Sequence, residues 1–277
     1  LLKKDGTPVL DKDGNPVTAV TDDQGKYSFR GLPLGEYTVS VVDPTSGPLE
    51  GTKPTEAYTG RYKTTADVRI AEATGSVIDV NFGFVKPASV GDYTWMDVNR
   101  DGIQDGDEPA LPGVTVTLTY EDGSAVTDAS GKPVGAVTTD ANGKYVFANL
   151  LPGDYKVSFT NPAGYAATVS DAGADRAKDS NGTESAVSLA QGQDDATVDY
   201  GLVGTGVIGD QLFVDVNQNG GGAPDAGDKV LPGVKVTLTW TGPGGITRTY
   251  ETTTDADGTY KFENLLPGDY KVSIDPE

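Results

Sequence analysis

Oxygen-bearing groups recur at fixed intervals within a twelve-residue stretch near the middle of the chain. They occupy the positions 1, 3, 5, 7, 9 and 12 that bind calcium in a calcium loop, position 7 through its backbone carbonyl: Asp97, Asn99, Asp101, Ile103, Asp105 and Glu108. Gly102 at position 6 permits the sharp turn that such a loop needs. Calcium is a hard cation that prefers several oxygen ligands, so the spacing predicts a calcium site. The alternative is a solvated acidic turn.

The residues that flank this loop predict strands. Apolar and polar residues alternate over 91–97 before the loop and over 113–120 after it, with the period of a half-buried strand. Pro109 and Pro112 disfavour a helix at the loop exit. An EF-hand calcium sensor needs a helix on each side, so we interpret the ion as a structural metal mounted in a β-protein.

A long sequence repeat divides the chain into modules. Residues 143–158 recur with small changes as 258–273 and, earlier, as 25–40, with a period of about 115 to 118 residues. A period of this length is a whole domain. We therefore predict three tandem modules: 1–88, N-terminally incomplete; 89–203, complete; and 204–277, C-terminally incomplete. On this interpretation the chain is a segment of a longer array.

Short acidic motifs that end in glycine precede each repeated Tyr-x-Phe segment, at 22–25, 140–143 and 255–258. They predict tight hairpin turns in which glycine adopts a positive φ and aspartate accepts from nearby backbone. An additional contact between Asp140 or Asp255 and an ion stays open. The alternating aromatic and aliphatic residues that follow the turn are expected in the core.

The composition indicates an acidic extracellular β-protein and argues against an enzyme. There are 41 acidic and 21 basic residues, a net charge of −20, and no cysteine or histidine. Such a charge repels nucleic acid and anionic membrane surfaces. Without His or Cys the chain lacks the usual acyl-transfer relay and thiolate, and its paired carboxylates stand at metal-ligand spacing. We predict no catalysis, no nucleic-acid partner and no segment embedded in a membrane.

The motifs together resemble a known family. Gly-Asp-x-x-Trp-x-Asp-x-Asn-x-Asp-Gly at 91–102, Leu-Pro-Gly-Val-x-Val-x-Leu at 111–118 and the Tyr-x-Phe repeat resemble the B repeats of serine–aspartate-repeat adhesins, within the Cna-B-like, prealbumin-like group. The resemblance implies an all-β fold: tandem seven-stranded antiparallel β-sandwiches of immunoglobulin-like type in an extended array. It also implies several calcium ions per module.

Two further calcium sites follow from this resemblance. The third module carries an altered copy of the first loop, with one carboxylate fewer, two inserted residues and Asp instead of Glu at its end. Its candidate ligands are Asp215, Asn217, Asn219, Asp225 and Asp228. Fewer charges predict weaker calcium binding there. The segment 170–182 reads as a solvated loop from its residues alone. The resemblance assigns it a second site with three ligands: Asp175, Asp179 and Asn181.

Related Cna-B-like domains often contain a Lys–Asn isopeptide bond. Here the strand 91–96 has no lysine, Ser158 stands where the promoting acid is usual, and the closing strand carries Asp199. The first module has Asn81 at that closing position, and its segment 58–67 lacks the acidic residues of 170–182. We predict no isopeptide bond, and little calcium in the first module.

These observations predict a calcium-stabilised structural stalk of a bacterial surface adhesin, whose partners are the neighbouring modules of the chain. Two alternatives stay open: a module that binds a ligand itself, and a segment of a self-assembling fibre or surface layer. Host or cell-surface ligands would be bound by regions outside this segment. The expected location is extracellular, at the cell surface, wall-anchored or secreted.

The topology predicts where the first loop lies. A sandwich with an odd number of strands has its termini at opposite poles, so short junctions chain the modules end to end. The loop 97–108 follows the first strand and is therefore expected near the junction with the third module, where calcium could stiffen the joint.

Overall fold

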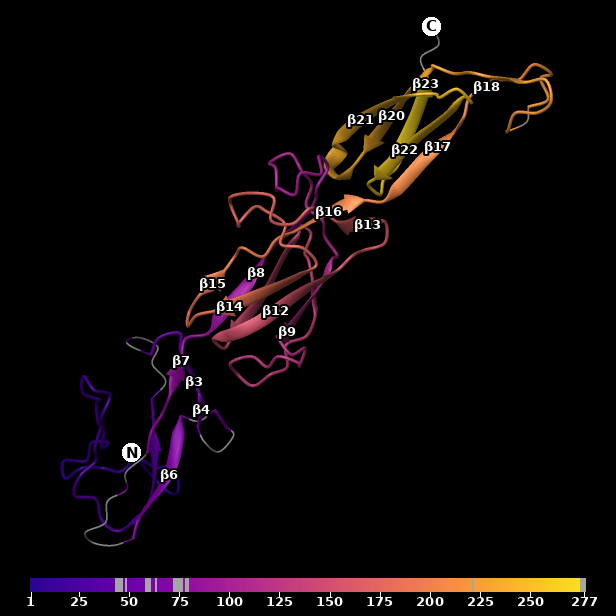
Figure 1. Ribbon diagram of the computed structural model, residues 1–277. Helices are drawn as coiled ribbons and strands as arrows, with labels where there is room; N and C mark the ends of the chain where they lie inside the picture. Colours follow the sequence, from indigo (N-terminus) through magenta and orange to yellow (C-terminus); the bar gives the residue numbers. More distant parts are fainter. Residues whose placement is uncertain are drawn as a thin grey trace.

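The strands of the molecule fall into three groups that follow one another along an elongated shape, with the termini in the two end groups (Figure 1). This computed structural model describes residues 1–42, 47, 49–57, 61–62, 64–71, 77, 80–220 and 222–274. Within this part of the chain the only helix is a 3-10 turn, η1 (Pro243–Gly245). No helix among the described residues is long and apolar enough to cross a membrane.

The middle group is a sandwich of two sheets. One sheet has the order β10-β9-β12-β14, and the other has the order β11-β8-β16-β13, with β15 also paired to β8. The strands are β8 (Ala88–Met96), β9 (Thr115–Tyr120), β10 (Val137–Thr138), β11 (Lys144–Leu150), β12 (Gly153–Thr160), β13 (Tyr165–Ala167), β14 (Glu184–Leu189), β15 (Asp194–Asp195) and β16 (Tyr200–Gly204).

The sandwich differs from the expected one in strand count and direction. It has nine strands instead of the expected seven, three of them no longer than three residues. The expected purely antiparallel pairing is wrong at β8, because β16 and β15 both run parallel to it. The first strand enters from one pole and the last leaves at the other, so both run the same way when they lie side by side. The termini are therefore at opposite poles, as predicted.

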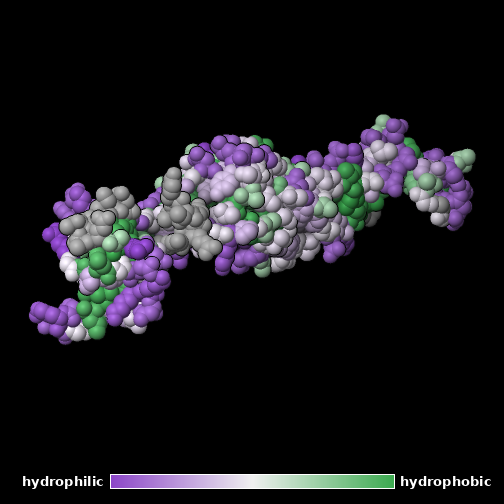
Figure 2. All heavy atoms as spheres, turned by 90° about the horizontal axis from the view of Figure 1, so that it is seen from below, coloured by the Kyte–Doolittle hydropathy of each residue, from purple (hydrophilic) through white to green (hydrophobic). Residues whose placement is uncertain are grey.

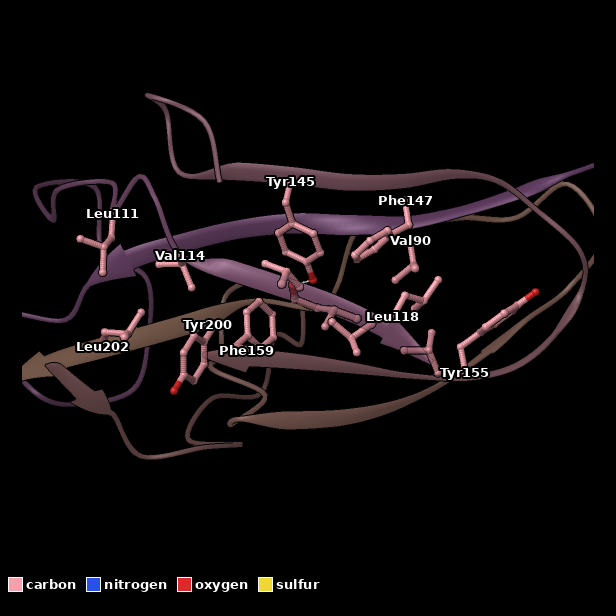
Figure 3. Packing of buried hydrophobic residues seen from close by; sticks show 14 of the residues in the cluster. Val90, Leu111, Val114, Leu118, Tyr145, Phe147, Tyr155, Phe159, Tyr200 and Leu202 are labelled. Carbon is pink, nitrogen blue, oxygen red and sulfur yellow. Dashed lines mark hydrogen bonds between the residues drawn. The ribbon is translucent and has the colours of Figure 1, made fainter. Parts of the chain in front are cut away.

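Alternation along the strands builds the core. In β12 the side chains of Tyr155, Val157 and Phe159 are buried, while the intervening residues are more exposed. Figure 3 shows Tyr145 and Tyr200 meeting Phe159 from the facing sheet; the ring of Phe159 stacks on Tyr200 at 4.5 Å and meets Tyr145 edge-on at 5.5 Å. The Tyr145 hydroxyl donates to the Val198 carbonyl at 2.8 Å, which satisfies its polar end. The aromatic residues predicted for the core are confirmed there.

The acidic turns form as predicted. The Asp140 carboxylate accepts from the backbone N–H of Asn142 at 2.8 Å and of Lys144 at 2.9 Å, and Gly143 has φ 73°. Asp255 and Asp22 accept from backbone N–H groups at the same offsets. These bonds occupy one oxygen of each aspartate in the turn itself.

The outer groups repeat parts of this plan. The first contains β1 (Leu2–Lys3), β2 (Gly35–Ser40), β3 (Lys53–Pro54), β4 (Glu56–Ala57), β5 (Arg61–Tyr62), β6 (Thr65–Ile70) and β7 (Phe84–Val85). The third contains β17 (Gly206–Gln211), β18 (Phe213–Val214), β19 (Lys229–Val230), β20 (Lys235–Thr241), β21 (Thr247–Thr253), β22 (Thr259–Leu265) and β23 (Asp269–Ile274). In the third group β21-β20-β23 form one sheet and β17-β22 another.

Candidate metal centre

The first acidic loop begins directly after β8 with a buried carboxylate. Asp97 is only 1% exposed, and both of its oxygens accept hydrogen bonds from the loop: Oδ1 from the Arg100 N–H at 2.5 Å and Oδ2 from the Gly102 N–H at 2.9 Å. The Thr168 hydroxyl also donates to Asp97. Gly102 has φ 77°, and a Cβ there would lie 2.4 Å from the Val169 carbonyl oxygen. Glycine at position 6 is thus required both by the turn and by close packing.

The next ligands of the predicted set converge on one point. The Asn99 side-chain amide donates to Asp101 and to Asp105, each at 2.9 Å. The Asn99 side-chain oxygen in turn accepts from the Asp101 N–H at 3.0 Å. Loop positions 3, 5 and 9 are therefore adjacent in space, as the calcium-loop spacing predicts.

Glu108 folds back to the start of the loop. Its Oε1 accepts from the Val98 N–H at 2.7 Å and its Oε2 from the Asp105 N–H at 3.2 Å. Burial raises the pKa of Glu108 to about 7, although these two hydrogen bonds lower it, and the Asp97 carboxylate also acts to raise it. Two carboxylates from the two ends of the loop therefore repel each other across a partly buried space.

The donor set fits a hard cation, because every side chain that the loop turns inward offers oxygen. In the part of the chain that the structure describes, no three acidic side chains stand close enough to hold a metal ion by themselves. Instead, the loop's own N–H groups and the Asn99 amide satisfy the carboxylates. Binding an ion would require these groups to give up part of that bonding.

The second candidate segment, 170–182, lies against the first loop. Ile103 forms a β-bridge with Asp179, the Gln104 N–H donates to the Lys178 carbonyl at 2.7 Å, and the Ser180 N–H donates to the Gly102 carbonyl at 3.0 Å. Two acidic segments about 70 residues apart in sequence thus share one pole of the sandwich. The spacing of the two segments in the sequence does not indicate this contact.

The three residues predicted for the second site are not equivalent. Asp179 is 2% exposed, and burial raises its pKa, with the Asp171 carboxylate adding to the effect. The Asn181 amide reaches the Asp179 carboxylate at 3.5 Å. Asp175 is exposed and accepts from the Ala177 N–H at 3.2 Å within its own turn. The structure brings Asp179 and Asn181 together and leaves Asp175 at the surface.

The third loop repeats the first one despite its insertion. Asp228 accepts from the Val216 N–H and the Asp225 N–H, each at 3.0 Å, which are the counterparts of the two bonds to Glu108. The amides of Asn217 and Asn219 both donate to Asp225. One oxygen of Asp215 accepts from the Gly220 N–H at 3.0 Å, and the other is buried with no hydrogen-bond partner among the residues that the structure describes. A buried carboxylate oxygen at this position of the loop is a suitable ligand for a hard cation.

One buried acid was given no binding role by the sequence. Asp199, just before β16, is fully buried, and neither of its carboxylate oxygens has a hydrogen-bond partner of good geometry among the described residues. Burial raises the pKa of Asp199 to about 8, and the nearby backbone N–H of Tyr93 opposes this rise. It lies beneath the segment 170–182, since Ser180 pairs with it as a parallel β-bridge. The alternation of the closing strand could have indicated its face, but not what covers it.

Arg100, at position 4 of the first loop, leaves the loop and reaches the third group of strands. Its guanidinium donates from Nη2 to the Gly204 carbonyl at 2.8 Å and to the Asn264 carbonyl at 3.2 Å. The backbone of Arg100 is left-handed, with φ 67°, which turns this side chain away from the inward ligands. The expectation that the loop lies at the junction with the third module is confirmed.

The junction also has an apolar part. Trp240 of β20 and Leu266 belong to the same buried cluster as Met96 and Leu202 of the middle group. A Cβ on Gly204 would lie 2.1 Å from the Leu265 carbonyl oxygen, so the two backbones touch. At the rim, the Arg248 guanidinium pairs with Asp107 at 2.6 Å and lowers the pKa of that carboxyl.

Comparison with known proteins identifies relatives over most of the chain. The family described as "SdrD B-like domain" matches residues 88–202 and 206–277. Serine-aspartate repeat-containing protein F of Staphylococcus epidermidis is 38% identical over 278 residues, covering 95% of this chain and 15% of that protein. Serine-aspartate repeat-containing protein D of Staphylococcus aureus strain Newman is also 38% identical, covering 96% of this chain and 19% of that protein. The chain therefore spans less than a fifth of the length of these relatives.

Solved structures with a similar arrangement include the Bacillus anthracis TIE protein, with a TM-score of 0.43 and 19% identity, covering 100% of this chain and 44% of that one. The streptococcal ancillary pilin aligns with a TM-score of 0.33 and 19% identity, covering 88% of this chain and 66% of that one. At these scores neither likeness bears on function.

Proposed function

The chain belongs to the SdrD B-like domain family, and from this premise we propose that it is a structural stalk segment of a bacterial cell-surface adhesin. In this proposal calcium stabilises the modules, and the stalk holds a binding region that lies elsewhere in the protein away from the cell. The partners of each module are then its neighbours in the chain, and the location is extracellular.

The observation that carries the stalk proposal is the joint between the middle and third groups. An apolar contact through Trp240 and Leu266 lies at its centre, and Arg100 bridges its two sides with hydrogen bonds. A stalk needs such fixed joints, because they keep successive modules in line, whereas free hinges would let the array bend. The space-filling view in Figure 2 shows the same elongated outline with hydrophilic residues prominent on that face.

Calcium is proposed on the donor set of the first loop. The ligands would be the Asp97, Asn99, Asp101, Asp105 and Glu108 side chains with the Ile103 carbonyl. When bound, a divalent cation offsets the repulsion among the loop carboxylates and favours the folded loop. The third loop would hold calcium less tightly through its smaller set of carboxylates, and the segment 170–182 would contribute a further site.

The test of calcium stabilisation is thermal unfolding of the 277-residue chain in calcium and in chelator. An ion that binds only the folded state adds about 2.7 kcal/mol at a hundredfold excess over its Kd, so several degrees separate the two melting temperatures. Asp101→Ala should reduce this separation. Asp154→Ala removes the same charge from an exposed strand position and should leave the separation intact. Identical wild-type curves in both conditions would contradict calcium stabilisation.

X-ray scattering tests the stalk. A single compact domain of this length would have a radius of gyration of about 19 Å. In calcium, the chain should give a clearly larger value at the mass of one chain. A value near 19 Å would mean that the modules fold back on each other. A mass of several chains would instead favour the fibre-forming alternative.

A further inference from the structure

The middle and third modules share a backbone bulge near the end of one strand. The pairing of β11 with β8 and of β22 with β17 shifts register there, at an asparagine with a left-handed backbone: Asn149 with φ 59° and Asn264 with φ 62°. A bulge takes a residue out of the regular ladder, so the carbonyl of each asparagine is directed to a donor outside its own sheet.

The two carbonyls accept from different donors. The Asn264 carbonyl accepts from the Arg100 guanidinium of the preceding module at 3.2 Å. The Asn149 carbonyl accepts from the Ala129 N–H of its own module at 2.7 Å. The Asn149 side-chain amide also donates to the two residues that flank Ala129, at 2.9 Å and 3.0 Å. The position that the third module offers to its neighbour is therefore filled, in the middle module, from within.

Ala129 belongs to a covering segment, residues 121–136, that follows β9. The segment is anchored by Val126 and Ala129, which are 0% and 1% exposed. In the third module, residues 241–251 stand in its place and form a plain hairpin. There β21 pairs with β20 along its whole length, whereas β10 pairs with β9 over two residues only. The third module, which is described without a gap over 241–251, has no counterpart of the covering segment above its bulge.

The aromatic residues beside the two bulges also differ in what they contact. Trp240 pairs with Tyr270 and belongs to the buried cluster that spans the joint. Tyr120 has the same register position in the middle module, opposite Tyr155, and stacks on that ring at 5.5 Å. The pole that carries Tyr120 faces the first group of strands (Figure 1). Tyr120 thus packs within its own module, whereas Trp240 takes part in a contact between modules.

The first module carries the same kind of covering segment. Its Val17 N–H donates to the Val9 carbonyl at 2.7 Å, as the Val134 N–H donates to the Val126 carbonyl at 2.9 Å. The chain therefore contains two kinds of module that differ in one hairpin. The first and middle modules have the covering segment, and the third module has the plain hairpin.

We propose that residues 121–136 close the middle module to the kind of joint that the third module forms. The docking surface of the third module, its Asn264 carbonyl and Trp240, fits one partner: the pole of a preceding module whose acidic loop carries an outward arginine at position 4. A module with the covering segment fills this surface itself, so such an arginine finds no acceptor there. The hairpin after the second strand of a module then determines which joints of the array are fixed. This inference builds on the proposed stalk and does not depend on calcium.

The experiment transfers the covering segment to the third module. In the 277-residue chain, residues 241–251 are replaced by a copy of 121–136, and spin labels at Glu184→Cys and Lys271→Cys, both exposed, report the distance across the joint. The distance distribution should be narrow without the transfer and broad with it, because the transferred segment occupies the Asn264 carbonyl. Arg100→Ala in the segment-transfer variant should then broaden the distribution no further, because the arginine is already displaced from the joint.

Two controls separate the covering segment from the side effects of the transfer. Insertion of Gly-Ser-Gly-Ser-Gly between Gly244 and Gly245 lengthens the hairpin to the same extent without a buried anchor or a fixed donor, and it should leave the distribution narrow. Arg248→Ala combined with Tyr250→Ala removes two side chains that the transfer also deletes, and it should broaden the distribution less than the transfer does. Equal broadening by either control would overturn the proposal.

A measurement on the wild type does not require the segment-transfer variant to fold. Hydrogen exchange should find the Ala129 N–H as strongly protected as the amides of β9, and equally so in Arg100→Ala. Rapid exchange at Ala129 would mean that the Asn149 carbonyl is open to other donors, and would overturn the proposal. A narrow distribution in the segment-transfer variant would overturn this inference alone, whereas a broad one in the wild type would overturn both the stalk and this inference.

Discussion

Arg100 offers a direct test of how the first loop and the joint are connected. Its backbone N–H donates to Asp97 within the loop, while its guanidinium donates to carbonyls on both sides of the joint. One residue therefore joins the predicted ion site to the orientation of the next module. Replacement by alanine removes the bridge and keeps a non-glycine residue at the left-handed position.

The expected magnitude follows from these contacts. A hydrogen bond from a charged group contributes about 1.5–3 kcal/mol when well formed. The bond to Gly204 is short and partly buried, whereas the bond to Asn264 is longer and exposed. We therefore expect Arg100→Ala to weaken the docked joint by about 2 kcal/mol. That value raises the undocked population about thirtyfold. The apolar contact around Trp240 remains, so the modules stay attached but less well oriented.

The measurement is a distance distribution between spin labels on the two modules. The sequence contains no cysteine, so Glu184→Cys and Glu251→Cys introduce unique attachment sites on exposed strand positions. In calcium the wild-type distribution should be narrow, and Arg100→Ala should broaden it. Arg248→Ala is the matched control, because this arginine also spans the joint but pairs with the exposed Asp107. Exposed ion pairs contribute little, so this variant should resemble the wild type.

Two results would refute the reasoning about Arg100. The first is a distribution for Arg100→Ala as narrow as that of the wild type. The second is an equal broadening by Arg248→Ala, which would mean that any loss of charge at the joint has the same effect. Calcium adds a further requirement. Chelator should broaden the distance distribution of the wild type but broaden that of Arg100→Ala little further, because the hydrogen bonds of Arg100 across the joint are already absent.

Three other predictions follow. In chelator, Asp199 has a pKa of about 8 in the folded chain and about 4 in the unfolded chain, so it should contribute stability below pH ~4 that is lost as pH rises through ~8. Urea midpoints measured at several pH values should show this decline. If the midpoint of the wild type changes with pH as steeply as that of Asp199→Asn, the prediction is contradicted. Leu150→Ala, at a fully buried position of β11, should cost about 2–5 kcal/mol in urea unfolding, whereas Val146→Ala on the exposed face of the same strand should change little. The intact mass should equal the sequence mass, and a deficit of one ammonia or one water would reveal a side-chain crosslink.

Features set by local chemistry could be predicted from the sequence. The turn at 140–143 forms because aspartate bonds the backbone two and four residues on and glycine takes the positive φ. The candidate ligands of the first loop converge because side chains two residues apart on a tight curl point inward together, as Asn99, Asp101 and Asp105 do. In both cases the residues that interact lie within a few positions of each other, so their spacing is sufficient evidence.

Features set by distant segments could not be predicted. The parallel pairing of β16 with β8 joins residues more than a hundred positions apart, and the alternation of each strand is compatible with either direction. The burial of Asp199 depends on the segment 170–182 crossing it, through bonds that the composition of neither segment indicates. The contact between Ile103 and Asp179 likewise arises only when the sandwich is closed. Sequence spacing predicted the candidate ligands, and the fold determines which of these residues lie close together.

The first loop directs its candidate ion ligands and its contact with the neighbouring module to different sides, because of how its positions alternate. Odd positions turn inward, where Asp97 and Asn99 meet the other ligands, and position 4 takes the left-handed conformation that directs Arg100 outward. The third loop has Gln218 at this position with φ 55°, so the same backbone shape forms without an arginine. The backbone of the loop therefore sets the outward direction of position 4, and the side chain at that position sets how strongly it bonds to the neighbouring module. Replacing Arg100 by glutamine should then make the joint less stiff while leaving calcium binding in the loop intact.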